Sequence, residues 1–490
     1  MKKAFPGKQV TIILSIVFSV VVYLFLDLGA GNEKAEIVAA AALLMALLWI
    51  TESIPLAATS LLPLVVFPLT GAVSAKSISQ AYVNSTIFLF VGGFIIAVAM
   101  EKWKLHKRIA VNIIYLLGNS PGKIILGFMI ASAFISMWIS NTATAVMLLP
   151  IGLSVIKKVE EENQNKNVKN FSITLMLAIA YSCSIGGLAT PIGTPPNLVF
   201  QRVFKINFPN YEQITFAGWM ALVLPITIIL LAFVWFLLNK IIYRTPSEIN
   251  IDRQIIKKEK LELGKLKSGE KSVLFVFIAT SLLWIFRSDI NTGLFVIPGW
   301  SNLMPASDFI DDGTVAITTA LLLFMIPVKN SNGGTGFVLE SDAINKIPWD
   351  IVLLFGGGFA LAYGFVDSGL SELIGKQFVS LKELNPFYLI LSICLIVTFL
   401  TELTSNTATA QILLPILASL SLELNINPML LMAPATFSAS CAFMLPVATP
   451  PNAIVFGSRK LRIKKMALPG VIINFTGAAV ITIIVMMNFL

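Results

Sequence analysis

Long apolar runs follow one another along almost the entire chain, and they constrain its fold more than any other feature. In a bilayer the backbone satisfies its hydrogen bonds only in helices or closed barrels, and about 20 apolar residues suffice for one helical crossing. Because these runs have helical length, we expect an all-α polytopic membrane protein. Its eleven spanning helices are predicted at residues 10–28, 35–52, 56–72, 86–101, 171–201, 214–239, 272–288, 313–328, 350–369, 429–457 and 467–488.

Composition argues against a soluble protein of this size. Of the 490 residues, 56% are hydrophobic and 12% are charged, whereas soluble domains carry about 25% charged residues. The net charge of +9 comes from basic residues clustered between apolar runs, which indicates membrane topology and no nucleic-acid partner. Cys183, Cys394 and Cys441 lack metal-binding spacing, so we expect them to pack in the apolar interior. The single His106 is expected in a solvated basic loop.

Two further apolar stretches, near 122–157 and 387–421, do not fit one crossing and carry Ser-Asn-Thr in the middle. Each is long enough for two half-length helices, so we predict two re-entrant helical hairpins. The positive-inside rule supports this topology with a cytoplasmic N-terminus, as in a plasma-membrane protein. The outside loops then hold only seven of the 35 basic residues, namely Lys34, Lys76, Arg202, Lys205, Arg287, Lys376 and Lys382.

Three sequence blocks recur in the same order in two halves of the chain. We expect a first half-repeat at 1–240, a charged cytoplasmic linker at 241–271 and a second half-repeat at 272–490. An odd number of crossings separates the copies, so the repeat is predicted to be inverted, as in many secondary transporters. The recurring pairs are ISNTATAVMLLPI at Ile139–Ile151 with TSNTATAQILLPI at Thr404–Ile416, LFVGGF at Leu89–Phe94 with LFGGGF at Leu354–Phe359, and TPIGTPPN at Thr190–Asn197 with LPVATPPN at Leu445–Asn452.

Polar groups in the middle of an apolar stretch are costly to bury unless they find partners. A broken helix would expose hydroxyls, an amide and free helix ends, whose N–H groups suit carboxylate oxygens. The paired prolines favour such unwinding. Two half-sites that face each other would therefore hold a ligand with an anionic group at each end. The expected donors are Ser140, Asn141, Thr142, Ser405, Asn406 and Thr407, with Thr194 and Thr449 as additions.

Neither Ser-Asn-Thr block contains Lys or Arg, so co-bound cations could supply the missing positive charge. Ser136 and Thr401 precede the motifs by four residues, one helical turn, where their oxygens could help to surround a hard cation. Glu52 and Glu402 lie close to membrane-embedded segments, and we favour a hydrogen-bonding role over ion relay. Ser and Thr also serve as packing groups in membrane helices, but the duplication of the whole motif argues for a binding site.

A channel and an intramembrane enzyme are the alternatives to a carrier. A channel with re-entrant loops needs no inverted pair of donors that holds one ligand. An intramembrane enzyme would call for HExxH, paired aspartates or an activated Ser–His pair, and the only histidine is in a predicted loop. We therefore expect a carrier and no enzyme activity.

The chain resembles the divalent anion/sodium symporters, the INDY-type dicarboxylate transporters. The resemblance rests on Ser136–Ile151, Thr401–Ile416, the two Thr-Pro-Pro-Asn blocks and WITESIPLAATSLLP at Trp49–Pro63. It implies a homodimer with scaffold and elevator-type transport domains. The implied substrates are C4 or C5 dicarboxylates such as succinate, malate, fumarate and 2-oxoglutarate, and some members carry citrate or sulfate. The family contains both Na⁺-coupled symporters and dicarboxylate exchangers, and the motif does not decide between them.

The resemblance also implies roles for individual residues. Substrate contacts would map to Asn141, Thr142, Asn406, Thr407, Thr194, Thr449 and Pro450. One sodium site would map to Ser136, Ser140, Asn141 and Gly193. The other would map to Thr401, Thr404, Asn406 and Ala448. No cofactor other than the coupling Na⁺ is expected.

Overall fold

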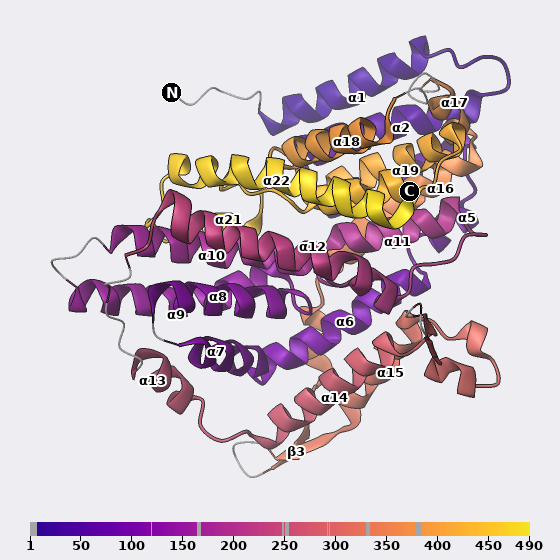
Figure 1. The fold of residues 1–490 in the computed structure, drawn as a ribbon. Helices are drawn as coiled ribbons and strands as arrows, with labels where there is room; N and C mark the ends of the chain where they lie inside the picture. Colours follow the sequence, from indigo (N-terminus) through magenta and orange to yellow (C-terminus); the bar gives the residue numbers. More distant parts are fainter. Residues whose placement is uncertain are drawn as a thin grey trace.

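The chain is mostly helical, with its long helices running side by side across the molecule (Figure 1). Among the residues described here, ten helices are long and apolar enough to cross a membrane, so the prediction of a polytopic helical membrane protein is confirmed. Lys382 and parts of the expected linker lie outside the described residues. The computed structural model describes residues 7–118, 120–163, 168–246, 249, 254–291, 293, 295–329, 334–377 and 384–490.

Seven of the eleven expected spans form single long helices. The prediction at 313–328 also falls on a helix, α15 (Asp312–Met325), but it has only 14 residues. A π-helical turn, η1 (Leu237–Ile242), continues α12 (Phe216–Phe236). The seven helices are α1 (Lys8–Phe25), α2 (Glu33–Thr51), α6 (Ser85–Lys102), α12 (Phe216–Phe236), α14 (Ser268–Ile285), α16 (Trp349–Asp367) and α22 (Ile463–Phe489).

The other three expected spans are each broken into two helices. At 171–201 and 429–457 the breaks lie at the Thr-Pro-Pro-Asn blocks, where unwinding was predicted, whereas the break within 56–72 was not predicted. In the described chain each of the three segments forms two helices with an unwound stretch between them. In each pair the second helix has proline at its first or second position. Proline explains where this helix begins, because it lacks the N–H that an interior turn needs. The pairs are α3 (Leu56–Thr59) with α4 (Leu62–Thr70), α10 (Lys169–Gly187) with α11 (Pro195–Asn207), and α20 (Met429–Ala439) with α21 (Pro450–Gly457).

Both Ser-Asn-Thr stretches break at the motif, as predicted. The serine of each motif is the N-cap of the second helix, a position that serine favours. The first helices have 16 residues each, but the second have 22 and 19 and are longer than the expected half-length. Re-entry into the membrane stays a prediction. The helices are α8 (Pro121–Ser136) with α9 (Asn141–Glu162), and α18 (Pro386–Thr401) with α19 (Asn406–Leu424).

His106 does not lie in a loop, which corrects the prediction. It lies in the first turn of α7 (Leu105–Leu117), and its Nδ1 is 2.9 Å from the Met100 carbonyl oxygen. Leu105, Ala110 and Ile114 bury one face of this helix, and the basic residues between them mask this amphipathic spacing in the sequence. The remaining elements are α5 (Ala75–Gln80), α13 (Gln254–Glu262), α17 (Leu370–Gln377), the 3₁₀ turns at Trp300–Leu303, Ser307–Phe309 and Ser341–Lys346, and the hairpins β1 (Ile290–Asn291) with β2 (Val296–Ile297) and β3 (Pro327–Lys329) with β4 (Thr335–Phe337).

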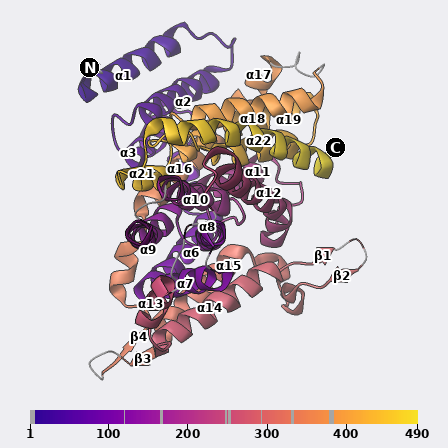
Figure 2. The ribbon, with the colours of Figure 1, turned by 60° about the vertical axis from the view of Figure 1, so that its left-hand side comes forward.

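The two halves of the chain are intertwined through their short broken helices. α11 of the first half packs against α16, α19 and α20 of the second half. Its repeat counterpart α21 packs against α9 and α10 of the first half. α10 itself is buried along its length from Phe171 to Gly187, and Figure 2 shows it in the middle of the bundle. This exchange brings the broken segments of both halves to the centre of the molecule.

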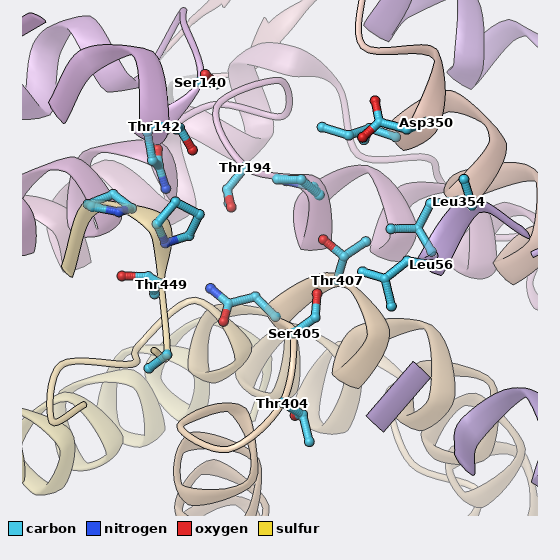
Figure 3. A pocket seen from close by; sticks show the side chains of 18 of the residues that line it. Leu56, Ser140, Thr142, Thr194, Asp350, Leu354, Thr404, Ser405, Thr407 and Thr449 are labelled. Carbon is cyan, nitrogen blue, oxygen red and sulfur yellow. The ribbon is translucent and has the colours of Figure 1, made fainter. Parts of the chain in front are cut away.

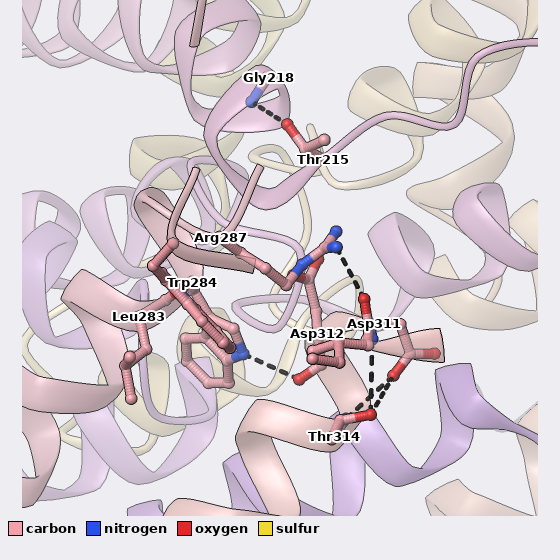
Figure 4. A network of polar contacts seen from close by, with 10 residues as sticks. Thr215, Gly218, Leu283, Trp284, Arg287, Asp311, Asp312 and Thr314 are labelled. Atoms are coloured by element: carbon pink, nitrogen blue, oxygen red, sulfur yellow. Dashed lines mark hydrogen bonds and ion pairs between the residues drawn. The ribbon is translucent and has the colours of Figure 1, made fainter. Parts of the chain in front are cut away.

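A polar corner joins α14 to α15 at the edge of the bundle. Arg287 Nε lies 2.5 Å from Asp312 Oδ1, and Trp284 Nε1 donates to the Asp312 carbonyl oxygen at 3.0 Å (Figure 4). Asp311 caps the first turn of α15 by accepting a hydrogen bond from the Thr314 N–H at 2.9 Å. These contacts fix the Trp284 ring, which stacks on Trp138.

Candidate substrate and cation site

A central cavity of about 850 Å³ is lined by both Ser-Asn-Thr tips and both Thr-Pro-Pro-Asn segments. This volume is within the usual range of ligand sites. In Figure 3, Ser140, Thr142 and Thr194 of the first half lie around the same space as Ser405 and Thr407 of the second. All predicted substrate residues line the cavity, namely Ser140, Asn141, Thr142, Thr194, Ser405, Asn406, Thr407, Thr449 and Pro450.

Four helices begin at this cavity. The N-cap residues of α9, α11, α19 and α21 are Ser140, Thr194, Ser405 and Thr449, and all four line it. The first turn of a helix carries N–H groups without intrahelical partners and a partial positive charge. Four such ends around one cavity favour anionic groups without any basic side chain.

The hydroxyl groups of the caps remain able to donate. Ser140 Oγ accepts a hydrogen bond from the Ala143 N–H at 3.2 Å, and Thr449 Oγ1 accepts one from the Asn452 N–H at 3.3 Å. In both cases the hydroxyl proton is left for another acceptor. A carboxylate oxygen in the cavity would provide that acceptor.

The charges that line the cavity are negative. Among the described residues that line it, none is Lys, Arg or His, whereas Glu52 and Asp350 are acidic and exposed. Glu52 is the C-cap of α2 and has a left-handed backbone conformation (φ 47°). An anion in this cavity would therefore be held by helix ends and neutral donors.

Oxygen atoms of the first half converge beside its Ser-Asn-Thr tip. Ser136 is fully buried, and its hydroxyl donates to Asn141 Oδ1. A methyl group built on Gly187 would lie 2.6 Å from Asn141 Oδ1 and 3.1 Å from the Gly193 carbonyl oxygen, so both oxygens border the same point. Carbonyl oxygens of unwound segments together with side-chain oxygens suit Na⁺, and these residues fit the expected first cation set with Ser140.

The second half has a corresponding group of oxygen atoms beside its Ser-Asn-Thr tip. Thr401 Oγ1 lies 2.7 Å from Asn406 Oδ1 and 2.8 Å from the Ala439 carbonyl oxygen. Thr404 and Ala448 of the expected second cation set line the cavity. The donor set again consists of neutral oxygens, which suits a hard monovalent cation.

The two tips differ in how they are covered. Trp138 is 9% exposed and its ring is stacked on Phe216 and Trp284, with centroid distances of 6.1 and 6.5 Å. Its repeat counterpart Leu403 is 73% exposed, and the neighbouring Val447 is 83% exposed. Trp138 is therefore covered by an aromatic cluster, while its counterpart Leu403 is exposed. The motif threonines show the reverse, since Thr142 is exposed and Thr407 is buried.

Comparison with known proteins identifies the chain's family. Residues 7–489 match the family profile described as the sodium:sulfate symporter transmembrane region. The chain belongs to this family of sodium:sulfate symporters. The predicted resemblance to sodium-coupled anion carriers is thereby confirmed.

Curated relatives match nearly the whole chain. The sodium-dependent dicarboxylate transporter SdcS of Staphylococcus saprophyticus is 43% identical over 484 residues, covering 98% of this chain and 91% of its own. SdcS of Staphylococcus aureus strain USA300 is 44% identical over 490 residues, covering 99% and 92%.

Two solved structures share the fold at low sequence identity. The YdaH transporter of Alcanivorax borkumensis has a TM-score of 0.58 at 11% identity and covers 99% of both chains. MtrF of Neisseria gonorrhoeae, whose structure is described within a class of antimetabolite efflux pumps, has a TM-score of 0.58 at 14% identity and covers 98% of this chain and 95% of its own. They support the architecture of this sodium:sulfate symporter family member and carry no argument about its substrate.

Some residues that shape the candidate site were not predicted from sequence. Asn197 is fully buried, and its Nδ2 donates to the carbonyl oxygens of Gly187, Leu188 and Thr190 at 3.2, 3.2 and 2.8 Å. Asn452 holds the second unwound segment in the same way, through Ala442 and Leu445, both at 3.1 Å. The sequence contains a signal for both asparagines, because each ends a repeated Thr-Pro-Pro-Asn block. The prediction nevertheless includes only the threonines and prolines of these blocks. Gly187, Asp350 and Trp138 carried no comparable signal.

Proposed function

We propose that this protein is a sodium-coupled symporter of C4 or C5 dicarboxylates such as succinate, malate, fumarate or 2-oxoglutarate. The observation that carries the proposal is the meeting of four helix N-termini, two from each half, at one cavity without basic side chains among its described lining residues. The curated relatives named sodium-dependent dicarboxylate transporters agree with it.

The dicarboxylate would lie between the two tips. One carboxylate would accept hydrogen bonds from Asn141, Thr142 and the first turn of α9, and the other from Asn406, Thr407 and the first turn of α19. Thr194 and the segment at Thr449 and Pro450 would close the sides. Because every donor is neutral, each contact is weaker than a salt bridge, and binding relies on several contacts at once.

Sodium coupling follows from the charge balance at the site. A dianion beside Glu52 and Asp350 would experience repulsion, since no described lining residue carries a positive side chain. Na⁺ ions at the Ser136, Ser140, Asn141 and Gly193 set and at the Thr401, Thr404, Asn406 and Ala448 set would supply the missing charge. Each cation would also fix the amide of the asparagine that contacts the substrate, so cation and substrate binding would be mutually favourable.

Dicarboxylate exchange without net sodium movement is the second candidate, because it would use the same donors. Citrate and sulfate are alternative substrates, and an anion channel is a further alternative. The different surroundings of the repeat counterparts Trp138 and Leu403 in one conformation support alternating access. We propose an elevator movement of the broken-helix core within a homodimer in the plasma membrane, with the N-terminus in the cytoplasm.

Reconstitution into proteoliposomes tests this proposal. Radiolabelled succinate uptake should accelerate at least about tenfold when a sodium gradient replaces choline on both sides, because the site cannot hold the dianion without cations. Uptake driven only by internal dicarboxylate, and unaffected by sodium, would establish exchange instead.

A counterflow measurement separates carrier from channel. With unlabelled succinate inside and sodium on both sides, a carrier accumulates labelled succinate transiently above its equilibrium level. A channel shows no such overshoot. Citrate and sulfate, tested in the same vesicles, rank the substrate class.

A further inference from the structure

Glu402 is a buried carboxylate that joins the second Ser-Asn-Thr tip to the unwound segment after α20. It directly follows Thr401, is 2% exposed, and accepts hydrogen bonds from three consecutive backbone N–H groups. The distances are 2.7 Å from Phe443, 2.8 Å from Met444 and 3.0 Å from Leu445. A fourth donor, Asn474 Nδ2 of α22, lies at 2.8 Å.

The first half joins the same two segments without a charge. At the position of Glu402 it has Met137, and at the position of Leu445 it has Thr190. The Thr190 hydroxyl donates to the Met137 carbonyl oxygen. One neutral hydrogen bond in the first half therefore corresponds to a carboxylate with four donors in the second.

The charge of Glu402 lacks a cationic side-chain partner. Among the ion pairs of the described residues, none includes it. A buried charge is stabilised by hydrogen bonds but gains further from a nearby opposite charge. The adjacent Thr401 belongs to the proposed second cation set, and Ala448 of that set lies in the segment that Glu402 holds.

We propose that Glu402 is a positioning residue that sets the sodium affinity of the second half-site, by fixing the unwound segment and by placing one negative charge beside the cation. The inference rests on the proposed sodium-coupled function. It makes the two half-sites unequal, because the first half-site has no corresponding charge. The second site would then bind its Na⁺ at lower concentration than the first.

The test measures sodium binding to the purified full-length protein without any transport. The thermal unfolding midpoint is followed as sodium replaces choline at constant ionic strength, and the half-saturating sodium concentration is read from the shift. Glu402→Gln keeps the side-chain size and removes the charge, so we expect this concentration to rise about tenfold. Succinate affinity at saturating sodium should change less than about threefold.

Asn474→Leu is the matched control, since it removes one hydrogen bond to Glu402 and keeps the charge. Its half-saturating sodium concentration should stay within about threefold of wild type. If Glu402→Gln proves too unstable to purify, the double variant Glu402→Met, Leu445→Thr replaces it. This variant introduces the neutral threonine-to-carbonyl hydrogen bond of the first half, and we expect the same rise in the half-saturating sodium concentration.

Two results would overturn the inference while leaving the proposed function intact. One is a wild-type sodium response that Glu402→Gln leaves unchanged. The other is an equal shift in Asn474→Leu, which would assign the effect to packing. A wild-type protein without any sodium-dependent shift would overturn both the inference and the proposed symport.

Discussion

Thr401 Oγ1 donates a hydrogen bond to Asn406 Oδ1 over 2.7 Å, and Ser136 makes the corresponding contact with Asn141 in the first half. In both halves the hydroxyl of the preceding helix engages the oxygen of the motif's amide. Neither amide nitrogen donates a hydrogen bond within the described part of the chain, so each is available to a carboxylate in the cavity. One asparagine can therefore bind cation and substrate through different atoms, which provides a physical basis for their coupling.

Removal of sodium should destabilise the protein. Cations that bind only the folded state stabilise it by about 2.7 kcal/mol per site at a hundredfold excess over the dissociation constant. We therefore expect a lower thermal unfolding midpoint in choline than in sodium, and a further rise when succinate is added with sodium. Succinate alone in choline should have little effect. An equal shift by succinate with and without sodium would argue against coupled binding.

Asp350 should weaken the binding of a dianion through charge repulsion across the cavity. Asp350→Asn removes one negative charge from the lining, so the half-saturating succinate concentration at fixed sodium should fall roughly two- to fivefold. The measurement is initial uptake as a function of succinate concentration. Asp308→Asn, an exposed substitution outside the cavity lining, is the control and should leave this concentration unchanged. An unaltered value in Asp350→Asn would show that this carboxylate does not act on the substrate.

The sequence predicted the site better than it predicted the spans. Ser140, Asn141, Ser405 and Asn406 were found because the repeat marks them, and the chain breaks at them as expected. Hydropathy alone gives one span at 171–201, because the unwound residues beside Gly187 stay mostly apolar and buried. Only the paired prolines of the Thr-Pro-Pro-Asn block indicate the break there. The exchange of the short helices between halves depends on contacts far apart in sequence, which no local pattern encodes.

Asn197 should contribute strongly to stability, because its buried amide holds three carbonyl groups. Asn197→Leu leaves those carbonyls without this partner, at a cost of about 2–4 kcal/mol. The thermal unfolding midpoint and sodium-dependent uptake should both decrease. Asn207→Leu is the control. It removes one partly buried hydrogen bond, from Asn207 Nδ2 to the Val203 carbonyl oxygen at 2.8 Å in the same helix. Its loss of unfolding free energy should be less than about 1 kcal/mol. Equal stability of the two variants would contradict the role of Asn197.

Trp138 should stabilise the protein through the aromatic cluster beside the first tip. Trp138→Leu introduces the residue type of its repeat counterpart Leu403 and removes the ring contacts with Phe216, Phe277 and Trp284. We expect a loss of about 2–3 kcal/mol, measured by thermal unfolding in sodium. Leu403→Ala, at the exposed counterpart, should cost less than about 1 kcal/mol. Similar losses at both positions would refute the asymmetry between the tips.

The central claim is that both halves bind one dicarboxylate together. Isothermal titration of succinate into the purified protein in sodium tests it with wild type, Asn141→Ala, Asn406→Ala and the exposed control Asn488→Ala. A shared site predicts one succinate per chain in wild type and in the control, and an affinity reduced roughly 10- to 100-fold in each of the other two variants. Two succinates per chain in wild type, with one retained at full affinity in either single variant, would show that the half-sites bind independently and would contradict the account.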